Sequence, residues 1–178
     1  MPRILKLFLF GIVSLVILLA LISLILPRTV RIERAAYVEA EPREVFAALN
    51  ELKGYPAWNP WCRDTAGVQL HFSPLTHGVG ARYSWTGRGQ SGGGSYTITG
   101  SRPDSLLEYR MEVTGLPPLK GQFNVRAVPG GTGSRIRWTV FADAGWRPWW
   151  RFWVSMADRL FGPAVETGLN KLKQVCER

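Results

Sequence analysis

The chain opens with one long apolar run. Residues 7–26 read LFLFGIVSLVILLALISLIL and carry no charged side chain. As an α-helix with a rise of about 1.5 Å per residue, a run of this length spans about 30 Å, the thickness of the hydrocarbon core of a bilayer. The pattern therefore predicts one transmembrane helix.

A cleavable signal peptide is the competing interpretation of this run. Its apolar core should be about 7–15 residues long and end in a small-x-small site, and Leu24-Ile25-Leu26-Pro27-Arg28 offers no such site. We therefore expect an anchor over residues 1–27 and a folded domain over residues 28–178, held in the cell membrane by a single pass. Basic residues flank both ends of the run, so the side of the membrane that holds the domain stays open.

A strand and a helix follow the apolar run with almost no linker. The apolar positions of the strand share one face, which only Arg34 interrupts, and they are Val30, Ile32, Ala36 and Val38. Glu41-Pro42-Arg43-Glu44 predicts a helix start, because proline and an acidic side chain both suit a first turn. We expect Gly54 and Pro56 to end this helix, and a short second helix or turn to follow over residues 57–61.

From Val68 onward the period of the pattern is two. It predicts strands near residues 68–73, 79–87, 94–102, 106–114, 120–128 and 134–143. The inner faces run from Val79, Ala81, Tyr83 and Trp85 to Phe123, Val125, Ala127, Ile136, Trp138 and Val140, and the outer faces carry polar residues such as Arg82, Arg137 and Thr139. Short turns rich in Gly and Pro join the strands, which favours an antiparallel meander with one wet face.

The chain closes with a long amphipathic helix from about Pro148 to Cys176. Apolar residues recur every three or four positions, and Gly162-Pro163 inside the pattern should kink the helix. The order predicts an α+β domain with a strand, two short helices, a curved antiparallel continuation of six strands, and a long C-terminal helix laid across the inner side of the sheet.

Four phrases in this order resemble the START-like helix-grip (SRPBCC) superfamily. They are residues 45–50 (VFAALN), 55–61 (YPAWNPW), 78–85 (GVGARYSW) and 162–173 (GPAVETGLNKLK). The chain is most similar to the polyketide cyclase/dehydrase branch, in forms with an N-terminal membrane anchor, over residues 30–176. The resemblance implies a deep cavity between the sheet and the last helix that takes up apolar small molecules or lipids. It carries no catalytic motif onto particular positions.

A set of mainly aromatic side chains should point into the space under the last helix. The candidate ligand-binding residues are Trp58, Trp61, Tyr83, Trp85, Tyr96, Tyr109, Met111, Phe123, Trp138, Phe161 and Val165. Tyr and Trp need partners for their OH and NH groups, which suits a partly open apolar pocket. Aromatic residues at such positions also form ordinary cores, so both interpretations stay open.

A second aromatic cluster lies at the start of the last helix. It contains Trp146, Arg147, Trp149, Trp150, Arg151 and Trp153. Trp together with Arg is typical of the membrane interface, where amphipathic rings lie at headgroup level. The alternative is that these tryptophans cap the sheet.

Residues for catalysis are scarce. Gly87–Gly92 matches GxGxxG but joins two strands, so it lacks the context of a dinucleotide site. The two histidines, His71 and His77, belong to no metal or triad motif. Glu108 and Glu112 fall on the wet face, which leaves Asp143 as the best-placed acid. We predict no catalytic residue, metal or cofactor.

Charge and cysteine content add little to this picture. The formal charge is +9, but the basic residues are scattered and form no nucleic-acid motif, so we expect no nucleic-acid partner. Cys62 and Cys176 belong to no CxxC or Cys/His cluster. Free thiols are favoured for them, and a disulfide stays open.

Three function classes follow. The favoured one is a membrane-anchored binding or carrier protein for an apolar small molecule or lipid. The alternatives are a cyclase, dehydratase or hydrolase that uses the same cavity, and a protein-interaction module of the co-chaperone kind, whose partner the sequence does not identify.

Overall fold

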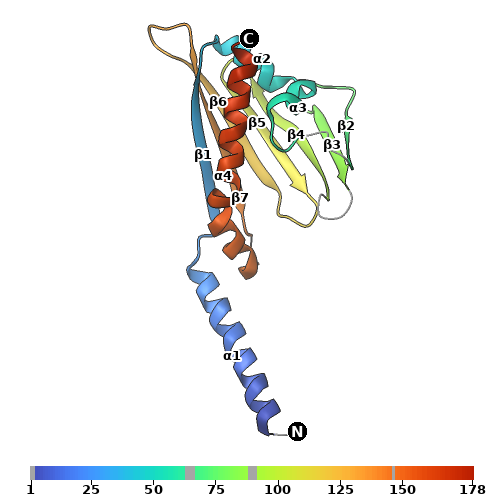
Figure 1. Ribbon diagram of the computed structural model, residues 1–178, viewed down its shortest axis with the longest axis vertical. Helices are drawn as coiled ribbons and strands as arrows, with labels where there is room; N and C mark the ends of the chain where they lie inside the picture. Colours follow the sequence, from blue (N-terminus) through green and yellow to red (C-terminus); the bar gives the residue numbers. More distant parts are fainter. Residues whose placement is uncertain (1–2, 63–66, 88–91, 146) are drawn as a thin grey trace.

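The computed structural model describes residues 3–62, 67–87, 92–145 and 147–178. Figure 1 shows a folded domain with one helix, α1, leaving from its lower end. The elements are α1 (Arg3–Ile25), β1 (Thr29–Val38), α2 (Pro42–Asn50), a 3-10 turn (Leu52–Gly54), α3 (Tyr55–Trp58), β2 (Val68–Phe72), β3 (Arg82–Gly87), β4 (Gly93–Arg102), β5 (Leu106–Val113), β6 (Leu119–Ala127), β7 (Ser134–Asp143) and α4 (Pro148–Cys176). The predicted order of strand, short helices, six strands and long helix is confirmed.

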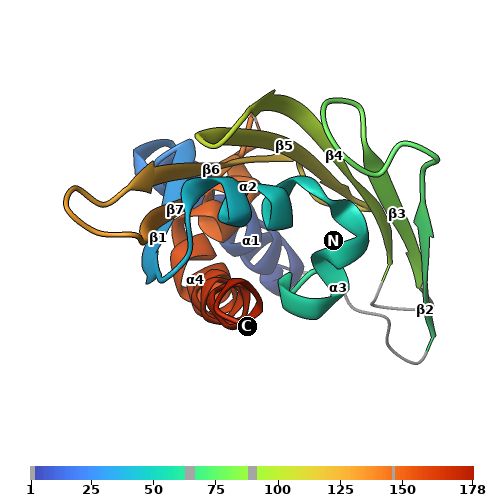
Figure 2. The same cartoon turned by 90° about the horizontal axis from the view of Figure 1, so that it is seen from above.

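The seven strands form one antiparallel sheet. Their order is β1-β7-β6-β5-β4-β3-β2, so β2 to β7 are the predicted meander and β1 closes the far edge against β7. Seen from above, the sheet curves around α2, α3 and α4, which lie on its concave side (Figure 2). The domain core lies between these helices and the inner face of the sheet.

Helix α4 lies across the sheet and continues through Gly162-Pro163. In Figure 1 its first, orange turns lean away from the axis of the red turns, in line with the expected kink. Arg34, the residue that interrupts the apolar face of β1, reaches Asp158 of α4 at 3.0 Å. The break in the apolar pattern is therefore an ion pair between strand and helix.

The residues that end α2 differ from the expected ones. The helix starts at Pro42, as expected, and Glu41 caps it through a capping box with Glu44. The helix ends earlier than expected, at Asn50, because Glu51 has an extended backbone with φ −97° and ψ 104°. Pro56 belongs instead to the first turn of α3.

The prediction of which residues lie on the inner face is wrong at two positions, Val79 and Ala127. The strand expected from residue 79 begins at Arg82, and Val79 is 58% exposed. The backbone turns there, because Gly78 and Gly80 adopt φ values of 75° and 91° that favour glycine. Ala127 is exposed at the end of β6.

The prediction that the outer face is exposed to water is also wrong at one position, Thr139. Thr139 lies on the outer face opposite Glu33 but is fully covered. Its hydroxyl donates to Oε2 of Glu33 at 3.4 Å, so a neighbouring side chain shields it from water.

Candidate functional site

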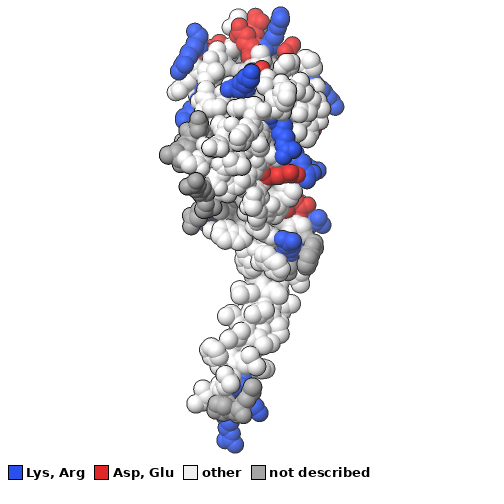
Figure 3. Space-filling view, turned by 90° about the vertical axis from the view of Figure 1, so that its right-hand side faces the viewer, with Lys and Arg blue, Asp and Glu red and all other residues white. Residues whose placement is uncertain are grey.

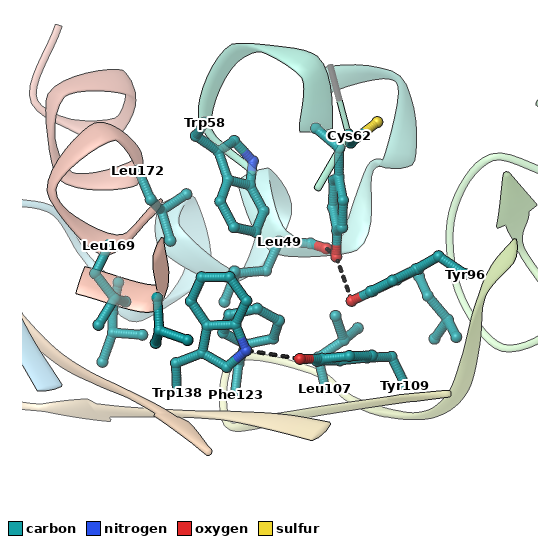
Figure 4. Packing of buried hydrophobic residues seen from close by; sticks show 14 of the residues in the cluster. Leu49, Trp58, Cys62, Tyr96, Leu107, Tyr109, Phe123, Trp138, Leu169 and Leu172 are labelled. Atoms are coloured by element: carbon teal, nitrogen blue, oxygen red, sulfur yellow. Dashed lines mark hydrogen bonds between the residues drawn. The ribbon is translucent and has the colours of Figure 1, made fainter. Parts of the chain in front are cut away.

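One aromatic side chain per strand runs across the inner face of the sheet from β3 to β7. The row consists of Tyr83, Tyr96, Tyr109, Phe123 and Trp138, and all are at most 1% exposed. Successive ring centroids are 5.1, 4.5, 5.7 and 4.7 Å apart. These distances are close to the strand spacing of about 4.8 Å, so each ring contacts the next. Figure 4 shows the part of the row from Tyr96 to Trp138.

The segment from Tyr55 to Trp61 covers this aromatic row. The ring centroid of Trp58 lies 5.8 Å from that of Phe123 and 5.9 Å from that of Trp138. Trp61 lies 5.2 Å from Trp138 and is partly exposed. The side chains of this segment therefore pack directly on the aromatic row.

Two glycines allow this close packing. A Cβ at Gly121 would lie 2.2 Å from the ring of Tyr109, and a Cβ at Gly168 would lie 2.7 Å from that of Trp138. Gly121 therefore lets a tyrosine ring lie flat on β6, and Gly168 lets α4 approach the sheet. The space under α4 is filled by side chains at these points.

The polar groups of the row are mostly satisfied inside it. Nε1 of Trp138 donates to the Tyr109 hydroxyl at 2.8 Å (Figure 4). The Tyr55 hydroxyl donates to the carbonyl of Leu49 at 2.8 Å. The Tyr55 and Tyr96 hydroxyls are 3.1 Å apart. Burial raises the pKa of Tyr55, Tyr96 and Tyr109 far above the ordinary value of a phenol. These phenols are neutral structural groups at physiological pH.

Four buried polar atoms accept or donate no standard hydrogen bond among the described residues. They are Nε1 of Trp58, Nδ2 of Asn59, the hydroxyl of Tyr83 and Nε of Arg151. The Tyr83 hydroxyl interacts with the Cys62 thiol, which is a weak hydrogen-bonding group.

The structure brings all eleven predicted ligand-binding residues around one core. Nine are buried, and Trp61 and Phe161 are partly exposed. Their contact with a ligand stays a prediction, because the rings pack on each other. Of the eleven, Phe161 also reaches a groove outside this core.

That groove has a volume of about 210 Å³ and walls that are almost wholly apolar. It lies between the first half of α4, the β5–β6 loop and the end of β7. The lining residues are Leu116, Pro117, Leu119, Ala142, Asp143, Trp150, Trp153, Val154, Ala157, Leu160 and Phe161.

Two apolar stripes on the first half of α4 frame the groove. The inner stripe, with Trp150, Val154, Ala157 and Phe161, faces the sheet. The outer stripe consists of Trp149, Trp153, Met156 and Leu160, which are 57%, 60%, 48% and 48% exposed. Sequence reasoning missed Leu160 and the loop residue Leu116. Leu160 could have been found, because it continues the Trp149–Trp153–Met156 spacing on the helix side away from the core.

The residues predicted to lie at the membrane interface are found in different environments. Trp149 and Trp153 are exposed, and Trp150 lines the groove. Nη1 of Arg151 donates to the carbonyl oxygens of Ser23 and Leu24, at 3.2 and 3.3 Å, and so caps the end of α1. Arg147 is exposed, and Trp146 lies outside the described residues.

The candidate acid Asp143 is already engaged. It accepts hydrogen bonds from Nε and Nη2 of Arg28, at 3.0 and 3.3 Å, and from the amide of Gly145 at 2.7 Å. The bond from Arg28 and the Gly145 amide lower the pKa of the Asp143 carboxyl. At neutral pH this side chain is a paired carboxylate rather than a proton donor.

The surroundings of the histidines and cysteines also show no arrangement typical of a catalytic or metal site among the described residues. His71 is exposed on β2, and Nδ1 of His77 lies 3.9 Å from Oε2 of Glu51. In the part of the chain that the structure describes, no cluster of His, Cys, Asp and Glu could hold a metal ion. Both cysteines are free, and burial raises the pKa of Cys62 to about 12 and that of Cys176 to about 11. The question of a disulfide is answered: the thiols are not bonded.

The GxGxxG segment lies between the antiparallel strands β3 and β4. β3 ends at Gly87 and β4 begins at Gly93. Residues 88–91 lie outside the described residues. The flanking strands agree with a connection between two strands rather than a helix start after a strand.

Comparison with known proteins gives a family and a fold. The family model described as "Polyketide cyclase / dehydrase and lipid transport" matches residues 29–177. No curated protein matches the chain. Solved structures match at low identity, including a protein of unknown function, SA2116, from Staphylococcus aureus. Its TM-score is 0.60 at 11% identity, over 84% of this chain and 94% of that one.

Two further matches have names. Ara h 8.0201 matches with a TM-score of 0.58 at 14% identity, over 83% of this chain and 97% of that one. The Aha1 dimer from Colwellia psychrerythraea matches with a TM-score of 0.55 at 19% identity, over 83% of this chain and 96% of that one. At these identities the likeness shows the fold alone, which is the helix-grip fold expected from the sequence.

Proposed function

The chain belongs to the polyketide cyclase/dehydrase and lipid transport family, and on that premise we propose that it is a membrane-anchored protein that binds an apolar chain in the α4 groove. The family match supports a module for hydrophobic ligands. The finer proposal is that α1 holds this module at a bilayer and that the groove takes its ligand from there.

The observation that carries the proposal is the position of the groove. Trp150, Trp153 and Val154 of α4 line it. Arg151, which follows Trp150 in the same turn, is hydrogen-bonded to the last turn of α1. α1 leaves the domain at the end where α4 begins (Figure 1). A membrane around α1 would therefore lie next to the groove and the outer stripe.

The chemistry of the groove limits its ligand. Its walls offer one ionised side chain, Asp143, which Arg28 already pairs. The volume of about 210 Å³ lies below the range of about 300–1,000 Å³ of sites for drug-sized ligands. An alkyl chain or a single apolar ring suits this space better than a whole lipid.

The surface of α1 supports the anchor. By length and composition the helix meets the requirement for crossing a membrane, as a signal sequence near an N-terminus also can. Its apolar side chains from Ile4 to Ile25 are mostly exposed in the protein alone. On the face of α1 that Figure 3 shows, charged side chains lie only at its free end, and they are basic. Burying such a surface in lipid is strongly favourable.

Native mass spectrometry of the full chain from neutral detergent tests the proposal. The wild type should retain a lipid or fatty acid, and Leu160→Asp should lose it, because a carboxylate in the groove wall repels an alkyl chain. Leu75→Asp is the matched control, since Leu75 is equally exposed, at 47%, and lies outside the groove.

Each outcome is decisive. Retention of the ligand by Leu160→Asp with normal folding contradicts the groove as the binding site. A mature mass that lacks residues 1–27 contradicts the anchor and leaves the groove to be judged by the ligand result.

A further inference from the structure

A basic hollow adjoins the apolar groove. The hollow has a volume of about 600 Å³, and it shares Leu116, Pro117, Asp143 and Trp150 with the groove. Its other lining residues are Arg110, Gly115, Pro118, Lys120, Ala144, Gly145 and Arg147. A ligand could therefore occupy both spaces without leaving the protein surface.

Two of the basic side chains of the hollow are directly opposed. Arg110 of β5 and Lys120 of β6 are register partners on the outer face of the sheet. Like charges in this position repel each other, because cross-strand Cβ atoms are only about 4.5–5.5 Å apart. An anion between them relieves that repulsion.

The acidic side chains nearby do not cancel this charge. Asp143 is bonded to Arg28, which lies outside the hollow lining, and Glu112 accepts from Nε of Arg110 at 2.8 Å. The Arg110–Glu112 pair is about half exposed, so solvent screening makes it weak. Lys120 adds a second cation to the hollow.

We propose, building on the groove proposed above as a ligand site, that the ligand is an anionic amphiphile from the bilayer, with its alkyl chain in the groove and its headgroup between Arg110 and Lys120. Trp150 lies at the junction, because it lines both spaces. An indole suits this place, since it offers an apolar body and one polar NH group. The headgroup is a carboxylate or a phosphate.

The test compares one tail with and without a charge. Dansyl-labelled undecanoic acid and its methyl ester are added to the full chain in phosphatidylcholine nanodiscs, and energy transfer from tryptophan reports binding. The acid should bind about tenfold more tightly than the ester, the effect of one charge-assisted hydrogen bond. Added salt should weaken binding of the acid and leave that of the ester unchanged.

The double variant Arg110→Gln/Lys120→Gln should remove the preference for the acid and keep binding of the ester. The matched control is Arg126→Gln/Arg135→Gln, another directly opposed basic pair on the same face, which lines a different hollow. The control should keep the preference.

Four results would overturn this inference. Equal binding of acid and ester to the wild type removes the headgroup site but leaves the groove. Loss of the preference in the control pair moves the anion site to the other hollow. Displacement of the acid by inorganic phosphate at concentrations near the Kd of the acid marks a site for free anions. Binding of neither probe contradicts the groove itself, and with it the proposed function.

Discussion

Nη1 of Arg151 lies 3.2 Å from the carbonyl oxygen of Ser23, so the first turn of α4 is bonded to the last turn of α1. The last carbonyls of a helix have no partner within the helix, and a guanidinium is well suited to satisfy them. The bond joins the apolar helix to the wall of the groove. We expect this bond to restrict the movement of α1 relative to the groove.

Arg151→Gln should loosen that joint. Loss of a charged hydrogen bond costs about 1.5–3 kcal/mol, which corresponds to at least about tenfold faster local opening. Hydrogen exchange measured by mass spectrometry in nanodiscs should show faster exchange in the last turn of α1 and the first turn of α4. Arg159→Gln, an exposed arginine on the same helix, is the control. Equal exchange in all three proteins would refute the joint.

Tyr109→Phe should destabilise the domain by about 1–3 kcal/mol, because the buried Nε1 of Trp138 loses its acceptor. Tyr83→Phe removes a hydroxyl whose hydrogen-bonding neighbour is the weak Cys62 thiol, so its effect should be near zero or stabilising. Urea unfolding of both variants in detergent measures the difference. Equal destabilisation by the two changes would mean that the Trp138–Tyr109 bond contributes nothing specific.

Two tryptophans should separate stability from binding. Trp58→Ala, at a side chain that is 1% exposed, should cost about 3–5 kcal/mol of unfolding free energy. Trp153→Ala, at a side chain that is 60% exposed, should change stability by less than about 0.5 kcal/mol but weaken binding of an apolar dye. If a folded Trp58→Ala protein binds the dye more weakly while Trp153→Ala binds it as the wild type does, the ligand lies in the core instead.

Alkaline pH should unfold the domain cooperatively. Burial raises the pKa of Tyr55, Tyr83, Tyr96 and Tyr109, so each is protonated in the folded protein at pH values where the unfolded chain releases its proton. This contribution to stability is complete below about pH 10, the pKa of an unfolded tyrosine, and is lost as the pH rises above it.

Each such tyrosine adds a slope of about 1.4 kcal/mol per pH unit to the loss. Urea midpoints at pH 8 and above pH 10 measure it, and Tyr83→Phe should reduce the slope by the share of one tyrosine, about 1.4 kcal/mol per pH unit. A midpoint that does not change with pH would show that these phenols reach water in the folded protein.

Local patterns predicted most of the fold. The period of two along the strands and the spacing from Val154 to Val175 depend only on neighbouring residues, so the predicted bounds of α4 match the observed ones. The pairing of β1 with β7 joins residues far apart in the sequence, from Val38 with Ser134 to Thr29 with Asp143. Alternation says which face is buried but not which strand is the neighbour.

The site was harder to predict for the same reason. The sequence brings Tyr109 to the inner face, but only the register shows that Gly121 lies opposite and lets the ring lie flat. Because close neighbours fill the space around each ring, the aromatic row is a packed core. Leu116 lines the groove from a loop, where no periodicity marks it.

Photocrosslinking in nanodiscs tests the central claim most directly. A fatty acid with a diazirine at the end of its tail is activated by light, and the modified peptides are mapped by mass spectrometry. We predict crosslinks within residues 150–161 and 116–119 that excess unlabelled fatty acid suppresses, while crosslinks to α1 from bulk lipid persist. Crosslinks confined to α1, or suppressible crosslinks at Trp58 and Phe123 instead, would contradict a ligand groove at the membrane end of the domain.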